Sequence, residues 1–194
     1  MLRPLMVGLI MGVALNSCTY PRQVIRLNPA PFNTPAVSAA SVADHTVVLV
    51  TRDMRSVQEI GRRRSGSPDE AAITTDTDIP GLLRVQMTDI LKAKGYFVLA
   101  EGSSSTAPTL EVQLKELSYV AFEASGQRKV KIQVLLATQI KNGSGSFQKT
   151  FQAQEERRVV FEPVAKSNEE WINETFADAL KEVANDTGLY THLN

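Results

Sequence analysis

A stretch of alternating apolar and polar residues in the second half of the chain constrains the fold most. Apolar side chains occupy alternate positions from Leu110 to Leu114, and the pattern then slips by one residue and resumes at Leu117. A period of two predicts a β-strand with one face in the core, because successive side chains point to opposite faces. The slip predicts a β-bulge near Lys115 and Glu116.

Two further strands are predicted after this one. The turn sequence "ASGQ" separates it from residues 128–141, which alternate again, and Asn142-Gly143 is a strong hairpin signal. Residues 146–161 return as the partner strand, with Phe147, Phe151 and Ala153 facing inward. In this strand the charged run "EERR" predicts an exposed edge that is protected against aggregation.

The first half of the domain predicts a strand, a helix and a second strand. "HTVVLV" opens a buried strand over residues 45–54, and "YFVLA" over residues 96–100 is another. Between them, residues 78–94 carry apolar side chains at helical spacing, with Pro80 in the first turn and Gly95 at the C-terminal end. This order favours parallel strands joined by a crossover. The intervening "GRRRSGSPDE" reads as a loop.

A second helix is predicted near the C-terminus. Ser167 and Glu170 have the spacing of a capping box, an apolar stripe follows, and Gly188 is expected to end the helix. The element order is therefore β-α-β-β-β-β-α. We expect an α+β fold with a mixed, largely antiparallel sheet of about five strands and two helices packed on one face.

The composition narrows the classes of function. The chain of 194 residues has 21 basic and 21 acidic residues, so it lacks the net positive charge typical of nucleic-acid binding. It has one cysteine and two histidines, and these do not have the spacing of a metal site. We recognise no sequence motif for a nucleotide, a metal, a catalytic triad or another cofactor, so a non-enzyme is expected.

The N-terminus carries a short basic region and an uncharged apolar run that ends at the only cysteine. The run is too short for a stable membrane span but fits a secretory signal. "LNSC", which ends at Cys18, resembles a bacterial lipoprotein box. That resemblance implies cleavage after Ser17 and acylation of Cys18. Because Thr19, and not aspartate, follows the cysteine, the sorting rule of that class favours the outer membrane.

We divide the chain into a signal peptide (1–17), a lipid-anchored tether rich in proline (18–44) and one globular domain (45–194). Repeated proline favours an extended backbone, which at about 3.1 Å per residue gives a tether of this length a reach of roughly 70 Å. An alternative is that the apolar patch at residues 24–27 pairs with the edge of the domain.

Taken together, these segments resemble the YajG family of bacterial lipoproteins. The local matches are "RDMR", "KGYFVL", "NGSGSFQKTF" and "SNEEWINETFADALKEVANDTGLYTHL", in this order. The resemblance implies a lipoprotein without an assigned activity. Cys18 is the one position whose role it carries over.

Two other sites are candidates for binding. Arg62, Arg63 and Arg64 form the most concentrated charge, and guanidinium groups bind phosphates or an acidic partner; a solvated loop is the alternative. Trp171 is a candidate partner contact, with a half-buried packing role as the alternative. The run Arg52-Asp53-Met54-Arg55 ends the first strand; we expect an ordinary ion pair there, with a contribution to a polar site at the end of the sheet as the alternative.

The function expected from these features is that of a non-enzymatic lipoprotein, anchored in the outer membrane and facing the periplasm, which binds an envelope protein or lipid or supports assembly. One alternative is a lipid-handling accessory, which requires an apolar groove. Another is a hydrolase of envelope polymers, which requires convergent carboxylates in a cleft.

Overall fold

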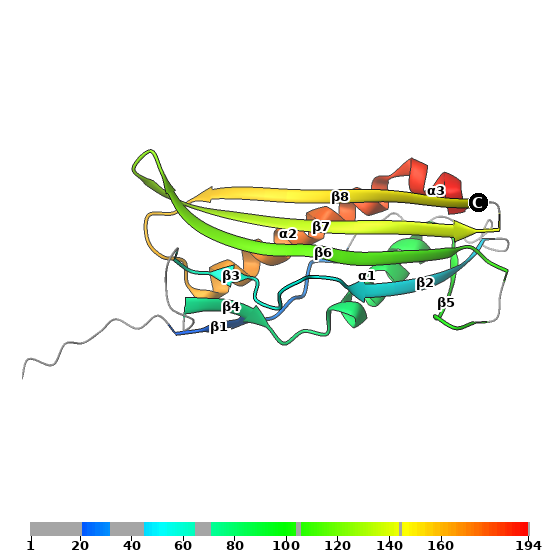
Figure 1. The fold of residues 1–194 in the computed structure, drawn as a ribbon, viewed down its shortest axis with the longest axis horizontal. Helices are drawn as coiled ribbons and strands as arrows, with labels where there is room; N and C mark the ends of the chain where they lie inside the picture. Colours follow the sequence, from blue (N-terminus) through cyan, green and yellow to red (C-terminus); the bar gives the residue numbers. More distant parts are fainter. Residues whose placement is uncertain (1–20, 32–44, 65–70, 104–105, 144, 194) are drawn as a thin grey trace, which may run out of the picture.

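The computed structural model describes residues 21–31, 45–64, 71–103, 106–143 and 145–193. Within these ranges the strands are β1 (Gln23–Ile25), β2 (Thr46–Asp53), β3 (Gly61–Arg62), β4 (Ala72–Thr75), β5 (Phe97–Leu99), β6 (Thr109–Ala124), β7 (Gln127–Asn142) and β8 (Gly145–Arg158). The helices are α1 (Ile79–Ala93), α2 (Ala165–Asn185) and α3 (Thr187–Leu193). Together they form an elongated mixed α/β domain in which one curled sheet carries the helices (Figure 1).

Three long strands, β6, β7 and β8, run along the length of the molecule (Figure 1). They pair antiparallel through the predicted turns at Ser125-Gly126 and after Asn142. The predicted bulge is confirmed, because the register shifts between Leu114 and Glu116. The shift keeps apolar side chains on the core face on both sides of it.

The edge of β6 away from β7 is shared between two strands. β2 pairs with its first half, from Thr109 to Leu114, and β3 pairs with Tyr119 and Val120 further along. The β2–α1–β5 unit is parallel, as predicted. Beyond β3 the sheet continues through β4 to β1, so this half is built from short strands.

The sheet differs from the one expected. It has eight described strands where about five were predicted, and four of the seven pairings between them are parallel. The expectation of a largely antiparallel sheet with two helices was therefore wrong. Part of the reason is that β1, β3 and β4 have two to four residues each, too few to show a period.

The C-terminal helices also differ from the prediction. α2 begins at Ala165, directly after extended Val164, and no side chain caps it. Ser167 therefore lies inside the first turn and does not cap the helix. α2 ends at Asn185, and Gly188 lies within α3. Pro163 favours an extended chain just before the helix, which places the start earlier than the capping pattern suggests.

The core lies between the sheet and the helices. Alternate residues of β6 and β7 meet the apolar stripes of α1 and α2. On these helices Leu83, Met87, Ile172 and Phe176 are fully buried. Such burial favours folding in proportion to the apolar area removed from water. Within the described ranges, no helix has both the length and the apolar composition needed to cross a membrane.

The described part of the expected tether, residues 21–31, lies on the domain. β1 adds a parallel strand to β4, and Ile25 and Leu27 are buried in the core. The main chain that follows is held by side chains of other elements: the amides of Arg26 and Asn28 donate to Glu169 and Asn173, at 2.8 and 2.7 Å. The structure thus shows the alternative in which this patch pairs with the domain edge.

Candidate functional site

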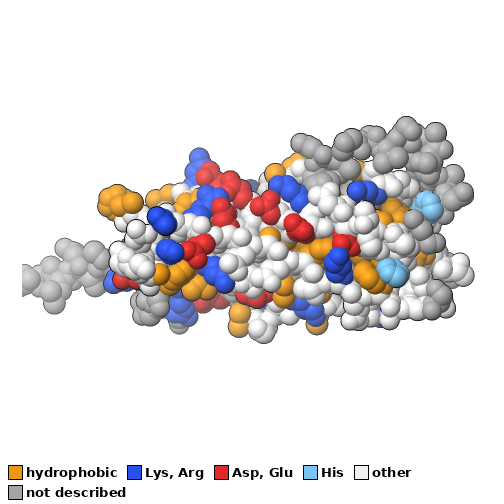
Figure 2. Space-filling model, turned by 90° about the horizontal axis from the view of Figure 1, so that it is seen from above, with side chains coloured by type: hydrophobic (Ala, Val, Ile, Leu, Met, Phe, Trp, Pro, Cys, Tyr) orange, Lys and Arg blue, Asp and Glu red, His pale blue; other side chains and the backbone are white. Residues whose placement is uncertain are grey.

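A groove of about 540 Å³ lies between α2, the end of β8 and the segment that follows β1. We call it the α2 groove. Its charged lining consists of five carboxylates and two cations: Glu155, Glu169, Glu170, Glu174, Asp178, Arg157 and Lys181. Figure 2 shows acidic and basic side chains side by side on the face seen from above. The lining therefore carries an excess of negative charge.

Local geometry explains why these residues meet. Glu155 and Arg157 are two residues apart on β8, so they share one face of the strand. On α2, Glu174, Asp178 and Lys181 are spaced by four and three residues, so they follow one another along one helix face. This spacing is readable in the sequence, but only the packing of β8 beside α2 turns two ordinary surface patterns into one groove.

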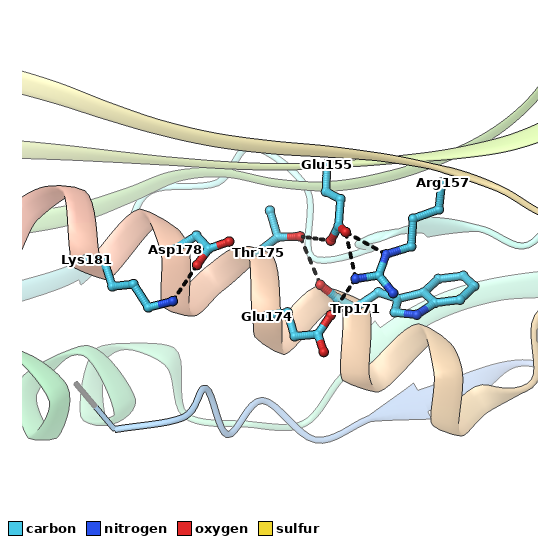
Figure 3. A network of polar contacts seen from close by, with 7 residues as sticks. All are labelled: Glu155, Arg157, Trp171, Glu174, Thr175, Asp178 and Lys181. Carbon is cyan, nitrogen blue, oxygen red and sulfur yellow. Dashed lines mark hydrogen bonds and ion pairs between the residues drawn. The ribbon is translucent and has the colours of Figure 1, made fainter. Parts of the chain in front are cut away.

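Arg157 is the centre of this network (Figure 3). Its Nε lies 2.7 Å from Glu155 Oε1, and its Nη2 lies 2.5 Å from Glu174 Oε2. Burial lowers the pKa of Arg157, but hydrogen bonds and charge from Glu155 and Glu174 outweigh that effect and raise it. The guanidinium therefore remains a fixed positive charge between two carboxylates.

The indole ring of Trp171 lies against the guanidinium group of this arginine (Figure 3). The guanidinium carbon of Arg157 lies 4.9 Å from the centre of the indole, within the range of a cation–π contact. Thr175 donates to the carbonyl oxygen of Trp171 at 2.9 Å and lies 3.4 Å from Glu155 Oε2. The half-buried indole packs against the core. Of the two readings of Trp171, packing is the one that the structure shows.

The predicted arginine cluster is divided between two surroundings. Arg62 pairs with Glu59 through an Nε–Oε1 distance of 3.0 Å. Arg63 and Arg64 instead line a cavity of about 370 Å³ with Arg128, which the sequence does not connect to them. Gly61 and Arg62 form strand β3, so the loop predicted here is wrong at its start. The approach of β7 to this end of β6 brings Arg128 in.

The remaining candidates have separate outcomes. Within the run from Arg52 to Arg55, the structure shows an ion pair at the end of the strand, between Asp53 and Arg55 at 2.9 Å. β8 pairs only with β7 in the described sheet, so the charged run lies on an edge strand as predicted. Cys18 lies outside the described residues. No group of three potential metal ligands occurs within the described ranges.

A comparison with models of protein families gives a match over most of the chain. Residues 33–194 match the Lipoprotein_16 family, described as "Uncharacterized lipoprotein". The chain belongs to this lipoprotein family. That membership agrees with the resemblance to the YajG family. No curated protein matches the chain.

A search of solved structures finds matches of low sequence identity, of which the first, at a TM-score of 0.50, shares the fold. An uncharacterised protein is 9% identical, with 84% of this chain and 97% of that chain covered and a TM-score of 0.50. A DUF330 protein from Xanthomonas campestris is 12% identical, with 89% and 94% covered and a TM-score of 0.48. A minor lipoprotein from Acinetobacter baumannii is 13% identical, with 77% and 90% covered and a TM-score of 0.42.

Proposed function

We propose that this lipoprotein is anchored in the outer membrane through acylated Cys18, faces the periplasm, and acts by binding another envelope component. Family membership supports a lipoprotein. The apolar leader ending in "LNSC" supports Cys18 as the lipidated residue, and Thr19 after it supports outer-membrane sorting. A single acyl chain gives only marginal membrane binding, and each further chain adds to the free energy of insertion. Several acyl chains on one residue therefore make the attachment effectively permanent.

The observation that carries the binding role is the α2 groove. Five carboxylates against two cations give a negative surface, and complementary charge both steers a partner and selects it. A basic segment of an envelope protein is the partner that fits this surface. Arg157 is fixed by two carboxylates and by Trp171, so the groove is already formed before a partner arrives. Pre-formed sites lose less free energy on binding.

The two alternative functions have less support in the described part of the chain. A lipid-handling role needs an apolar groove, but helix and sheet pack directly, with Leu83 and Phe176 fully buried between them. A hydrolase needs carboxylates that converge on a substrate. In the groove, Glu155 and Glu174 both hydrogen-bond Arg157, and Asp178 pairs with Lys181 at 2.7 Å.

A site-specific crosslinking experiment tests the groove. A photoreactive amino acid replaces exposed Lys181 in the full chain, and crosslinking is performed in intact cells. We expect one discrete adduct that is lost when the charges of the groove are reversed by Glu170→Lys and Asp178→Lys. The matched control, Asp89→Lys with Glu182→Lys, changes the same net charge on exposed residues outside the groove lining and is expected to keep the adduct.

The anchor is tested separately by the intact mass of membrane-extracted protein beside a Cys18→Ala variant. A mass that fits cleavage before Cys18 plus acyl chains supports the anchor. An unacylated mass contradicts it. An adduct that survives reversal of the groove charges contradicts the groove as the binding site, whatever the mass shows.

A further inference from the structure

One end of the molecule gathers the first described residues, β3, the turn between β6 and β7, and the segment from β8 to α2 (Figure 1). We call it the anchor end. The side-chain amides of Gln23 and Asn168 hydrogen-bond at 2.7 Å, which ties β1 to the first turns of α2. In the swapped orientation of the Gln23 amide, its oxygen instead accepts from Ala165 N at 3.3 Å and Arg63 Nε at 3.0 Å.

The chain after Cys18 is fixed to this end within a few residues. β1 pairs with β4, and Asn173 both accepts from Asn28 N and donates to the carbonyl oxygen of Arg26, at 2.7 and 3.0 Å. Three residues separate Cys18 from Arg22. Even a fully extended chain covers no more than about 14 Å over that stretch. A lipid on Cys18 therefore holds the anchor end close to the bilayer surface.

The same end exposes apolar side chains in the segment that joins β8 to α2. Val160 is 85% exposed, Phe161 is 82% exposed and Val164 is 63% exposed. Val160 and Phe161 are the two most exposed large hydrophobic residues in the described part of the chain. Strand pairing of Arg158 with Lys129 and the contact of Ala165 with Gln23 place this segment beside the chain exit.

Arg158 and Lys166 flank this apolar segment in the sequence, and both are exposed. Arg22 and Arg64 are also exposed at this end, against exposed Glu123, Glu156 and Glu170. Arg63 and Arg128 line the neighbouring cavity of about 370 Å³, where Arg128 lies 3.8 Å from Glu162. An aromatic residue with flanking Lys and Arg is the composition of segments that bind the interface of anionic bilayers.

We infer that the anchor end docks on the lipid surface, with Val160 and Phe161 in the interfacial layer and the cations of this end at anionic phospholipid headgroups. This inference rests on the acylation of Cys18 in the proposed function. Docking sets the orientation of the domain, because it turns the long axis of β6, β7 and β8 away from the bilayer (Figure 1). The domain then extends from the membrane into the aqueous compartment.

An environment-sensitive fluorophore on the acylated full chain tests the docking. Phe161→Cys provides the labelling site, because Cys18 is blocked by lipid. Phe97→Cys is the matched control, since Phe97 is 61% exposed and lies on β5 at the opposite end. The protein is reconstituted in vesicles of phosphatidylethanolamine and phosphatidylglycerol that carry a nitroxide-labelled lipid. We expect the label at 161 to shift to shorter wavelength and to be quenched about twofold or more relative to the label at 97.

A second comparison tests the charges. Arg64→Glu with Lys166→Glu is expected to reduce quenching at 161, and the loss is expected to grow with the phosphatidylglycerol content of the vesicles. Equal quenching at 161 and 97, in protein that floats with the vesicles and has the acylated mass, overturns the docking and leaves the anchor in place. A blue shift at 161 without vesicles assigns the patch to a second copy or another protein and also overturns it. An unacylated mass overturns the anchor and the docking together.

Discussion

Tyr119 places a phenol in the core at the middle of the β3–β6 pairing. The residue is 1% exposed, and its hydroxyl has no hydrogen-bond partner within the described part of the chain. Burial raises the pKa of Tyr119, Arg63 opposes the shift and Glu162 adds to it, so the phenol stays neutral. A buried hydroxyl without a partner costs free energy, because it gives up its bonds to water.

We therefore expect Tyr119→Phe to leave the free energy of unfolding unchanged or to raise it by up to about 1 kcal/mol. Tyr119→Ala removes the ring as well and is expected to cost about 3 to 5 kcal/mol through lost burial and a cavity. Urea denaturation of the two variants beside the wild type gives both values. A loss of more than about 1 kcal/mol in the phenylalanine variant would show that the hydroxyl donates to a partner. Glu162 is the candidate acceptor, because its charge acts on the Tyr119 phenol.

Asp53 and Arg55 form a two-point ion pair after β2. Two nitrogens of Arg55 each lie 2.9 Å from one carboxylate oxygen of Asp53, and the Arg55 side chain is only 3% exposed. Burial raises the pKa of Asp53, but the hydrogen bonds and charge of Arg55 outweigh it, so the pKa lies below its usual value. The pair then stabilises the fold above the unfolded-state pKa, near 4, and its contribution is lost as pH falls through the lower folded-state pKa.

The expected result is a variant whose defect depends on pH. Asp53→Asn leaves the Arg55 charge buried without its partner, so we expect a loss of about 3 kcal/mol at pH 6. The gap to the wild type should narrow between pH 4 and pH 2, where the wild type loses the same pair. Denaturant midpoints of the variant and the wild type across this pH range measure the gap. Glu182→Gln, at an exposed position of α2, is the control. A gap that stays constant with pH would mean that Asp53 contributes through packing alone.

At the level of elements, β3 depends on a very close approach to β6. Gly61 pairs with Tyr119, and a methyl group at Gly61 would overlap the main-chain carbonyl of Tyr119. Main-chain atoms of a paired strand have little room to shift. Glycine is therefore required here by space, and the pairing of β3 links β4 and β1 to the rest of the sheet.

Gly61→Ala is accordingly expected to destabilise the domain by about 3 kcal/mol, with β3, β4 and β1 the first elements to open. Gly143→Ala is the matched control, because nothing lies within 4 Å of a methyl group at that turn. Hydrogen exchange resolved by segment separates the two. Faster exchange in residues 71–75 and 22–28 of the Gly61 variant supports the link. Unchanged exchange there would show that β4 and β1 hold to the domain without β3.

Across the whole molecule, the sequence predicts best where a pattern is long and its partner is near. The three long strands and helix α1 repeat a period over many residues. The bulge near Lys115 and the turn after Asn142 lie within or between those strands, whose partners follow directly in the chain. β1, β3 and β4 are short, and the pairings of β1 with β4 and of β3 with β6 join residues far apart in sequence. Their formation depends on surfaces that exist only after the long elements have packed.

The candidate sites divide in the same way. The assignment of Cys18 stays a prediction, and it needs local sequence alone, since a lipoprotein box is a continuous motif. Arg62, Arg63 and Arg64 are adjacent in sequence, yet strand β3 sends Arg62 to Glu59 and leaves Arg63 and Arg64 beside Arg128. The α2 groove joins β8 to a helix through packing. No local pattern in the sequence indicates that contact, although the spacing on each element is visible.

The first described residues complete the domain, so their removal tests how far the fold depends on them. Ile25 and Leu27 are 1% and 3% exposed, and each contributes about 1.5 to 3 kcal/mol through burial. Ordering the segment costs part of this gain, so we expect a chain that begins at residue 33 to lose about 2 to 4 kcal/mol relative to one that begins at residue 21. Removal also leaves β4 as an unpaired edge, which favours aggregation.

Chemical denaturation and light scattering of these two chains measure both effects. A synthetic peptide with the sequence of residues 21–31 provides the specific control, because it carries the strand β1 and the buried Ile25 and Leu27. Added in trans, it should restore stability in proportion to its occupancy and suppress aggregation. A peptide with Ile25→Asp and Leu27→Asp should do neither. Equal stability of the two chains without peptide would mean that residues 21–31 lie on a domain that is complete without them, and would favour the long tether after all.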